Sequence, residues 1–306
     1  MDGFINVLKP PGMTSHDVVH WLRKNLDQKK IGHTGTLDPG ACGCLIIAVG
    51  KATKLSEYVL ELPKTYRCEM ELGWATDSGD TFGRVLEMRK VPPLSEQDIL
   101  TAFSKFTGNI RQVPPMTSAI KVNGKKLYEM AREGKTISRE ARPITIEALT
   151  LVSENLKLTK PKIVFDVICS KGTYIRSLCH DLGQELGCGA VMRFLIRSGV
   201  GPFKLKDTQI LEEIENCNSK EYLLPMDTPI ITWPKALLKD LFYAKKLAHG
   251  NLIEPSGFII NGNLTKDSMS RIRVYDHLNN FVAIGNLKYT ENGGLQPRKV
   301  FWPIEK

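Results

Sequence analysis

The order of apolar and polar residues predicts a series of strands along the chain. Lys64–Leu72 alternates strictly, so apolar side chains lie on one face and charged ones on the other, as in a half-buried strand. Shorter apolar runs predict further strands at residues 4–8, 45–49 and 163–169. Helical segments separate these strands, so a mixed architecture is expected.

Two helices follow from apolar residues at helical spacing. In the first, Thr14 or Ser15 is the N-cap, and the buried stripe is Val18, Val19, Leu22 and Leu26. In the second, Thr173 is the N-cap candidate, and the stripe is Ile175, Leu178, Cys179, Leu182 and Leu186. Arg176 falls in the first turn of the second helix. Because the helix dipole disfavours a cation there, an anionic partner for Arg176 is expected.

The last quarter of the chain has a different pattern. The proline-containing stretch 223–234 marks a boundary, and beyond it we expect a helix over 237–249 that ends at Gly250. Short strands are expected at 271–275 and 281–287, joined by a turn. Residues 231–306 contain 11 Lys or Arg and 6 Asp or Glu, a net charge of +5 out of +9 for the whole chain. The boundary and the charge difference therefore predict a small basic domain over residues 229–306, after a larger domain over residues 1–228.

The composition narrows the possible partners and chemistry. A net charge of +9 and a pI near 9.1 indicate a polyanionic partner, for which nucleic acid is the best candidate. Neither a membrane-spanning apolar run nor a signal peptide is visible, so a cytoplasmic protein without membrane association is expected. The seven cysteines are expected to be reduced thiols, and their spacing does not match a structural zinc site. The sequence contains no cofactor motif.

The stretch 32–43 carries the most distinctive candidate chemistry. It contains four glycines and one carboxylate, Asp38, which Pro39 biases toward an extended backbone just before an apolar strand. The glycines do not form a Walker loop, because no lysine follows Gly40 at the required position. Three interpretations of Asp38 remain open from spacing alone: a reactive carboxylate, a turn residue and a helix N-cap.

The motif Gly32-His33-Thr34-Gly35-Thr36-Leu37-Asp38-Pro39 resembles the signature of TruB-type pseudouridine synthases, which modify the tRNA T-loop. The family's other blocks recur in order: Leu8 to Ser15, Lys64-Thr65-Tyr66, Gly172 to Arg176, and Arg193 to Phe203. The resemblance implies an isomerase that converts uridine 55 of tRNA to pseudouridine without a metal or cofactor. It also implies an α+β catalytic domain on a central, mainly antiparallel sheet, and a small C-terminal β-barrel resembling a PUA domain.

The same resemblance assigns roles to individual residues. Asp38 is the catalytic carboxylate and Arg176 its partner, while Tyr66 stacks on the uracil. The remaining substrate-binding positions are Tyr174 and Leu195 in the base pocket and His33, which fills the gap left by the flipped nucleotide. From the residues alone, Tyr66 could equally be a core aromatic and His33 a loop imidazole satisfied by the backbone.

The basic segment within residues 108–145 has two interpretations. It carries seven basic and three acidic residues between Lys121 and Arg142, which fits a solvated charged helix or a surface that follows an RNA backbone. The family resemblance favours an RNA-gripping insertion. It also implies that the tRNA T-arm is the partner, that no protein partner is required and that the protein is a monomer. Ile196 stands where the family usually has an arginine, so a phosphate contact at that position is in doubt.

Two other functions remain possible on the sequence alone. A non-catalytic tRNA-binding folding chaperone would use the same basic surfaces. A guide-RNA-dependent pseudouridine synthase subunit, or more remotely an RNA glycosidase, would share parts of the same site. Turnover of tRNA by the chain without a guide and release of free uracil distinguish these alternatives.

Overall fold

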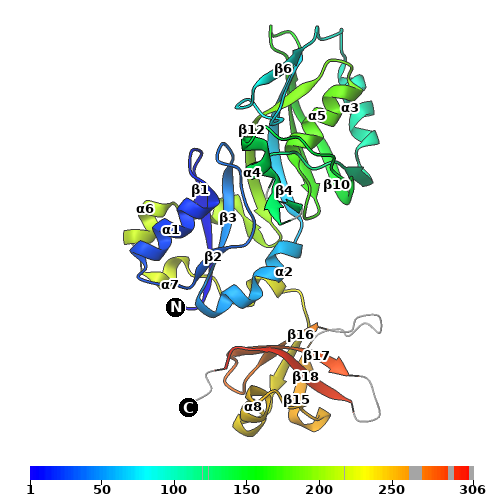
Figure 1. Cartoon of the computed structure of the whole chain (residues 1–306). Coiled ribbons are helices and arrows are strands. Elements are labelled where there is room, and N and C mark those ends of the chain that lie inside the picture. Colours follow the sequence, from blue (N-terminus) through cyan, green and yellow to red (C-terminus); the bar gives the residue numbers. More distant parts are fainter. Residues whose placement is uncertain (119, 123, 217, 262–270, 289–292, 303–306) are drawn as a thin grey trace.

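The computed structural model describes every residue except 119, 123, 217, 262–270, 289–292 and 303–306. Its described strands form two large sheets and two small hairpins, and helices flank the sheets (Figure 1). The strands are β1 (Gly3–Lys9), β2 (Ile31–His33), β3 (Cys42–Val49), β4 (Lys64–Leu72), β5 (Trp74–Thr76), β6 (Val85–Met88), β7 (Gly108–Gln112), β8 (Lys121–Val122), β9 (Lys125–Lys126), β10 (Arg142–Asn155), β11 (Lys162–Cys169), β12 (Ala190–Val200), β13 (Phe203–Lys204), β14 (Lys235–Leu238), β15 (Phe258–Asn261), β16 (Arg271–Tyr275), β17 (Phe281–Lys288) and β18 (Gly294–Val300). The α-helices are α1 (Ser15–Asn25), α2 (Ser56–Glu61), α3 (Glu96–Lys105), α4 (Leu127–Arg132), α5 (Ile175–Glu185), α6 (Leu211–Asn216), α7 (Ser219–Tyr222) and α8 (Leu241–Ala248).

The larger sheet confirms the expected α+β class and its mainly antiparallel character. Its order is β1-β3-β12-β4-β11-β10-β7, with β2 added to β3 and β13 to β12. The exception is the pairing of β3 with β12, which is parallel and places Arg197 opposite Gly43. Gly43 has φ +107°, and a Cβ there would lie 2.3 Å from the Arg197 carbonyl oxygen. Glycine is therefore required where the two halves of the sheet join.

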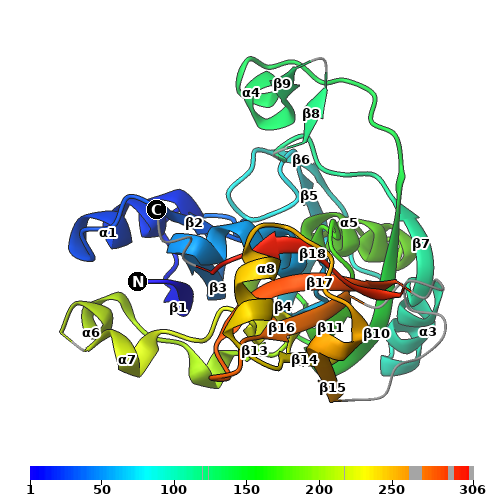
Figure 2. The ribbon, with the colours of Figure 1, turned by 90° about the horizontal axis from the view of Figure 1, so that it is seen from below.

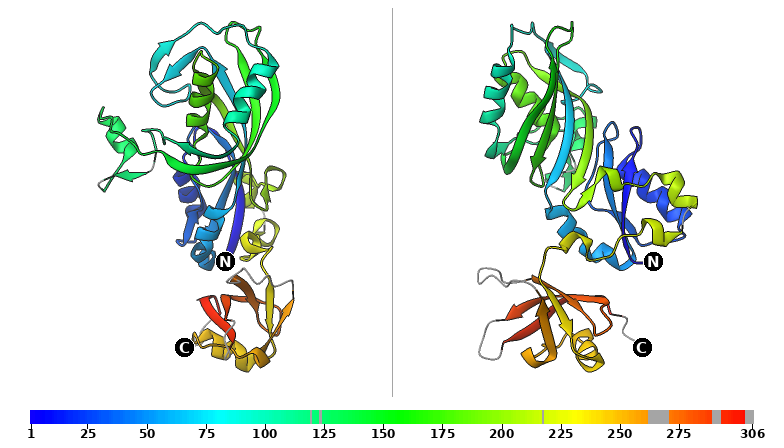
Figure 3. Two further views of the ribbon diagram at one scale, coloured as in Figure 1. Left: turned by 90° about the vertical axis from the view of Figure 1, so that its right-hand side faces the viewer. Right: turned by 180° about the vertical axis from the view of Figure 1, so that it is seen from behind.

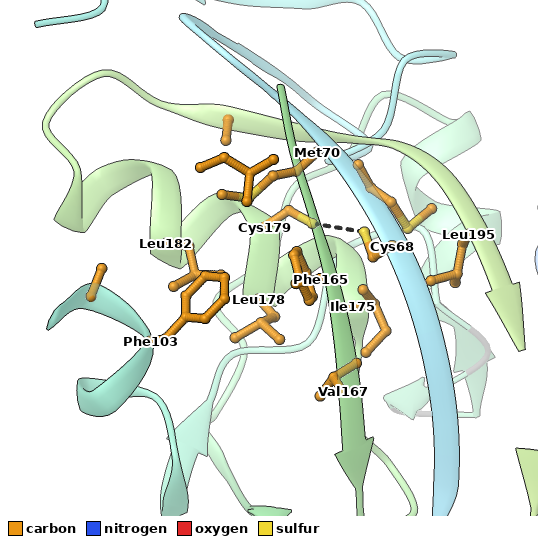
Figure 4. Close-up of a cluster of buried hydrophobic side chains, with 14 of the residues drawn as sticks. Cys68, Met70, Phe103, Phe165, Val167, Ile175, Leu178, Cys179, Leu182 and Leu195 are labelled. Atoms are coloured by element: carbon orange, nitrogen blue, oxygen red, sulfur yellow. Dashed lines mark hydrogen bonds between the residues drawn. The ribbon is translucent and has the colours of Figure 1, made fainter. Parts of the chain in front are cut away.

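One face of this sheet packs on α5 and α3 around a continuous apolar core (Figure 4). The alternation of β4 places Cys68 and Met70 in this core, and the periodic stripe of α5 places Leu178 and Leu182 there. Leu195 of β12 and Ile175 of α5 belong to the same cluster (Figure 4). The cluster thus extends to residues that line a pocket described below.

The two helices predicted from the sequence are present. Thr14 caps α1 in a capping box with Asp17, because each residue's side chain accepts a hydrogen bond from the other's backbone N–H. The N-cap of α5 is Tyr174, however, and the prediction of Thr173 is wrong. The Thr173 hydroxyl instead donates to the Ser170 carbonyl and closes the preceding turn.

The second sheet, of order β15-β14-β16-β17-β18, is built from residues after Trp233. The two C-terminal strands predicted from the sequence are present as β16 and β17. The helix predicted over 237–249 begins later than expected, because Lys235–Leu238 forms the strand β14 between β15 and β16. Asp240 caps the helix that follows, α8, and accepts from the backbone N–H of Tyr243. The sheet has five described strands in this order, and its closure into a barrel stays a prediction.

The segment between β7 and β10 leaves the body of the sheet and returns to it. The β8–β9 hairpin and α4 stand away from the main sheet (Figures 2 and 3), while β7 and β10 pair with each other at the sheet edge. The charged segment is therefore mostly extended or hairpin-like, and its only described helix is six residues long. Among the described residues, no helix has the length and apolar character needed to cross a membrane.

Candidate active site

A pocket of about 290 Å³ opens at the edge where the 32–43 loop meets β4, α5 and β12. Five of the six residues predicted for the site line it: Asp38, Tyr66, Tyr174, Arg176 and Leu195. These residues are up to 157 positions apart in sequence, since they span 38 to 195, and the sheet order brings them together. His33 is not part of the lining.

Asp38 and Arg176 form an ion pair at this pocket. The Arg176 Nε lies 2.9 Å from Asp38 Oδ2, and Nη2 donates to Asp38 Oδ1 at 3.4 Å. The Arg176 side chain is 5% exposed, whereas that of Asp38 is 38% exposed. The anionic partner predicted from the helix dipole is therefore present, and the exposed carboxylate faces a space that a substrate can enter.

Two other segments fix the guanidinium group of Arg176. Its Nη1 donates to the Ser78 carbonyl at 2.9 Å and also to the Thr117 hydroxyl, while Nη2 donates to the Thr117 carbonyl at 3.0 Å. Asp80 adds a second carboxylate, 4.0 Å from Nε. The sequence does not reveal residues 78–80 or Thr117 as parts of the site. Neither segment carries a spacing signal that links it to Arg176.

The backbone of the loop around Asp38 is held on several sides. Ser15 Oγ accepts from the Leu37 N–H at 2.8 Å, and the Pro39 carbonyl accepts from the Gly12 N–H at 2.8 Å. The Ala41 N–H donates to the Asp38 carbonyl at 3.0 Å, which forms a turn. No helix begins at this point, so the N-cap interpretation of Asp38 is wrong. The turn interpretation is correct for its backbone, and its carboxylate is left to pair with Arg176.

Lys9 is fully buried beneath this loop. Its ammonium group donates to the carbonyls of Pro10, Met13 and Pro39, the last at 3.3 Å. Burial lowers the pKa of Lys9 to about 8, although Cys42 and Asp38 partly oppose that change. The contact with Pro39 ties Lys9 to the loop that carries Asp38.

The aromatic residues form the apolar part of the wall. Tyr66 packs against the core cluster and also lines the pocket, so the two interpretations of this residue are compatible. Burial raises the pKa of the Tyr66 phenol, and the nearby Arg197 opposes the change. The backbone of Tyr174 is bracketed by the buried Gln112, whose amide accepts from its N–H at 2.8 Å and donates to its carbonyl at 3.1 Å. Gln112 therefore fixes where α5 begins.

Arg197 is a site residue that the sequence did not reveal. Its side chain is buried and donates to the carbonyls of Cys44 at 2.7 Å, Gly35 at 3.2 Å and Thr36 at 3.3 Å. It thus ties the Asp38 loop to β12, whereas Arg176 pairs with the Asp38 carboxylate from α5. The available signal was a cation inside a mostly apolar strand, which requires a buried set of acceptors. Its neighbour Ile196 pairs its backbone with Cys42 and Arg67.

His33 lies on β2, just before the loop. Its Nδ1 is buried and has no hydrogen-bond partner among the described residues, so full satisfaction by the backbone is excluded for that atom. Burial lowers the pKa of the imidazole, and the nearby His16 and Arg197 lower it further. These effects favour the neutral form of the imidazole.

The fold belongs to the pseudouridine synthase class. The structure aligns over 99% of this chain and 86% of the other with the solved "Structure of H/ACA RNP bound to a substrate RNA containing 2'-deoxyuridine", at a TM-score of 0.75 and 25% identity. It also aligns over 98% of this chain and 85% of the other with the "Crystal Structure of a Cbf5-Nop10-Gar1 Complex", at a TM-score of 0.74 and 27% identity.

Within that class, the chain belongs to the TruB family of pseudouridylate synthases. The model of the family's N-terminal domain matches residues 23–175, and that of the tRNA pseudouridylate synthase B C-terminal domain matches 176–230. A curated relative, tRNA pseudouridine synthase B of Alkaliphilus oremlandii, is 44% identical over 302 residues, which are 94% of this chain and 99% of the relative. The enzyme of the same name from Pelotomaculum thermopropionicum is 47% identical over 244 residues, 78% of this chain and 77% of the relative.

Proposed function

We propose that this chain isomerises uridine 55 in the T-loop of tRNA to pseudouridine, with Asp38 as the essential carboxylate. The observation that carries this proposal is the exposed Asp38 carboxylate, paired with the buried Arg176 at a pocket walled by Tyr66, Tyr174 and Leu195. Similarity to tRNA pseudouridine synthase B along 99% of a relative's length supports tRNA as the substrate.

The reaction breaks the N1–C1′ glycosidic bond of uridine and forms a C5–C1′ bond after the uracil has turned. The proton on C5 is lost and N1 gains one, so the atoms balance without a redox step or water. A single carboxylate suits this isomerisation, whereas glycoside hydrolysis uses two carboxyl groups and consumes water. Asp38 is positioned by Arg176 and by its turn to act on the ribose or the base.

The walls of the pocket have a separate task, which is to retain the detached base while it turns. Tyr66 stacks on the uracil. It is also our candidate for removing the proton from C5. Tyr174 and Leu195 confine the ring from other sides. A pocket of about 290 Å³ accommodates one nucleotide, so the target must leave the RNA stack to reach Asp38.

His33 lies outside the pocket and suits the place that the flipped nucleotide vacates. A neutral imidazole stacks on bases without the cost of burying a charge. The protruding segment between β7 and β10 and the basic sheet after residue 228 are the proposed contacts for the rest of the tRNA. The proposed division at residues 228 and 229 is supported by the absence of any described strand shared between the two large sheets. We also propose that the chain acts as a cytoplasmic monomer without a protein partner.

The test is release of tritium from C5 of uridine-labelled tRNA transcript, with the wild type compared with Asp38→Asn. We expect the variant to lose turnover at least 10³-fold while it binds tRNA within about threefold of wild type. The matched control is Asp166→Asn, because Asp166 is paired with Arg67 at the surface and does not line the pocket. The control should keep wild-type turnover.

Two further measurements address the rival functions. Free uracil in the product would mark a glycosidase, and turnover only with an added guide RNA would mark a guide-dependent subunit. If the wild type binds tRNA tightly but releases no tritium, the chaperone interpretation replaces the proposed one. A transcript with cytidine at position 55 tests which nucleotide of the tRNA is modified, and it should release no label from that position.

A further inference from the structure

The hairpin of β5 and β6 presents an aromatic side chain at the edge of the active site. Phe82, in the loop that joins these strands, is 79% exposed. One edge of its ring nevertheless touches Gly40, because a Cβ built on Gly40 would lie 2.4 Å from Phe82 Cε2. Gly40 belongs to the same turn as Asp38, so the ring stands beside the proposed catalytic residue while most of its surface is free.

The loop that carries Phe82 is built to hold it in place. Asp80 Oδ1 accepts from the Ser78 hydroxyl at 2.6 Å and from the Phe82 N–H at 3.0 Å. The Thr81 N–H donates to the Met192 carbonyl at 3.2 Å, which ties the loop to β12. The Ser78 carbonyl also accepts a hydrogen bond from the guanidinium of Arg176. The position of Phe82 is thus set by the network that positions the Asp38 partner.

Core packing does not account for Phe82, since it buries little of the side chain. An exposed apolar residue is common on protein surfaces and needs no explanation by itself. What distinguishes Phe82 is its location beside a pocket that admits one nucleotide of a much longer polyanion. The nucleotides next to the target must therefore pass over the rim of the pocket, which is the surface around its opening where Phe82 lies.

We propose that Phe82 stacks on a nucleobase of the substrate RNA next to the flipped uridine. This inference rests on the proposed function, because it takes the substrate to be RNA. A free aromatic face binds any unstacked base, and flipping a nucleotide out of the T-loop leaves its neighbours less stacked. The overall charge of +9 favours a polyanion over an apolar protein segment at this rim.

The test measures binding of a fluorescent T-arm hairpin and its turnover by wild type, Phe82→Ala and Phe82→Trp. We expect Phe82→Ala to weaken binding about 5- to 150-fold and Phe82→Trp to restore it, since each stacked base contributes that range. The slope of affinity against salt should not change, because no phosphate contact is lost. Met88→Ala is the matched control: Met88 is 77% exposed on the same hairpin, but only Phe82 supplies the atoms nearest to a Cβ built on Gly40.

A set of hairpins, each with one abasic position, identifies the partner base. At one position next to the target, loss of the base should weaken binding to wild type but not to Phe82→Ala. Equal losses for Phe82→Ala and Met88→Ala would overturn the inference, because they would indicate an effect of the whole β5–β6 hairpin and not of one stacked ring. Unchanged binding by Phe82→Ala would also overturn it. If the wild type neither binds nor modifies the hairpin, the proposed function itself fails, so the two failures are distinguishable.

Discussion

Replacement of Arg176 by lysine tests whether the geometry of the guanidinium, and not only its charge, positions Asp38. The arginine contacts five acceptor atoms: Ser78 O, Thr117 O and Oγ1, and both carboxylate oxygens of Asp38. A lysine ammonium has three donors on a single nitrogen and cannot reach acceptors on opposite sides of the site. At least two acceptors therefore lose their donor in Arg176→Lys.

The magnitude follows from burial. A buried acceptor without a donor costs about 1–3 kcal/mol, so the loss of two such contacts lowers the free energy of unfolding by about 2–6 kcal/mol. The ion pair itself contributes less than its distances suggest, because water reaches the 38% exposed Asp38. For turnover, a carboxylate displaced by about 1 Å costs about 100-fold. We expect kcat to fall about 100-fold and tRNA affinity to change less than threefold.

The assay is single-turnover tritium release at saturating enzyme, together with urea unfolding to show that the variant is folded. Arg67→Lys is the matched control, because Arg67 pairs with Asp166 through Nε at 2.8 Å and Nη2 at 2.7 Å but is 52% exposed and outside the pocket. It should keep wild-type turnover. If Arg176→Lys keeps more than a third of wild-type activity while folded, the positional role assigned to the guanidinium is refuted.

Two further predictions concern the framework of the site. Lys9→Met removes the donor from three carbonyls that are only partly buried and should lower the free energy of unfolding by about 2–4 kcal/mol in urea titrations at pH 7; a change under 1 kcal/mol contradicts this. The pKa of Lys9 is lowered from 10.5 to about 8 in the folded protein, so the unfolded chain binds more protons between these two pH values. The stability of the wild type relative to Lys9→Met should therefore rise as the pH increases from 8 to 10.5. A stability difference that does not change with pH refutes the pKa shift. Gly43→Ala should lower the free energy of unfolding by about 3 kcal/mol or more, since the new Cβ meets the Arg197 backbone. Gly187→Ala is the control, because Gly187 also has a positive φ of +78° but lies in open space, and it should lower the free energy of unfolding by only about 1 kcal/mol. Equal losses in urea unfolding would show that the close approach of β3 and β12 is unimportant.

The local elements were predictable where a residue's own neighbours decide its conformation. The alternation in β4 and the capping box at Thr14 are of this kind, because both patterns are contained in a few consecutive residues. The prediction failed at Leu237 and Leu238, which were expected to begin a helix but lie in the strand β14. Pairing on both sides by β15 and β16 satisfies their backbone groups and buries Ala236 and Leu238, and the sequence does not display those partners.

The candidate site was likewise predictable from the sequence only in part. The glycine-rich loop, its single carboxylate and the arginine in the first turn of α5 could be recognised in the sequence, since chemistry requires these residue types and helix electrostatics requires a partner for Arg176. The contributions of Thr117 and Arg197 could not, because both act through bonds to segments distant in the chain. Local physical chemistry thus determined which groups are available and which of them need partners. The tertiary structure alone decided which partners they have, since only the parallel pairing of β3 with β12 and the packing of α5 bring those segments within hydrogen-bond distance.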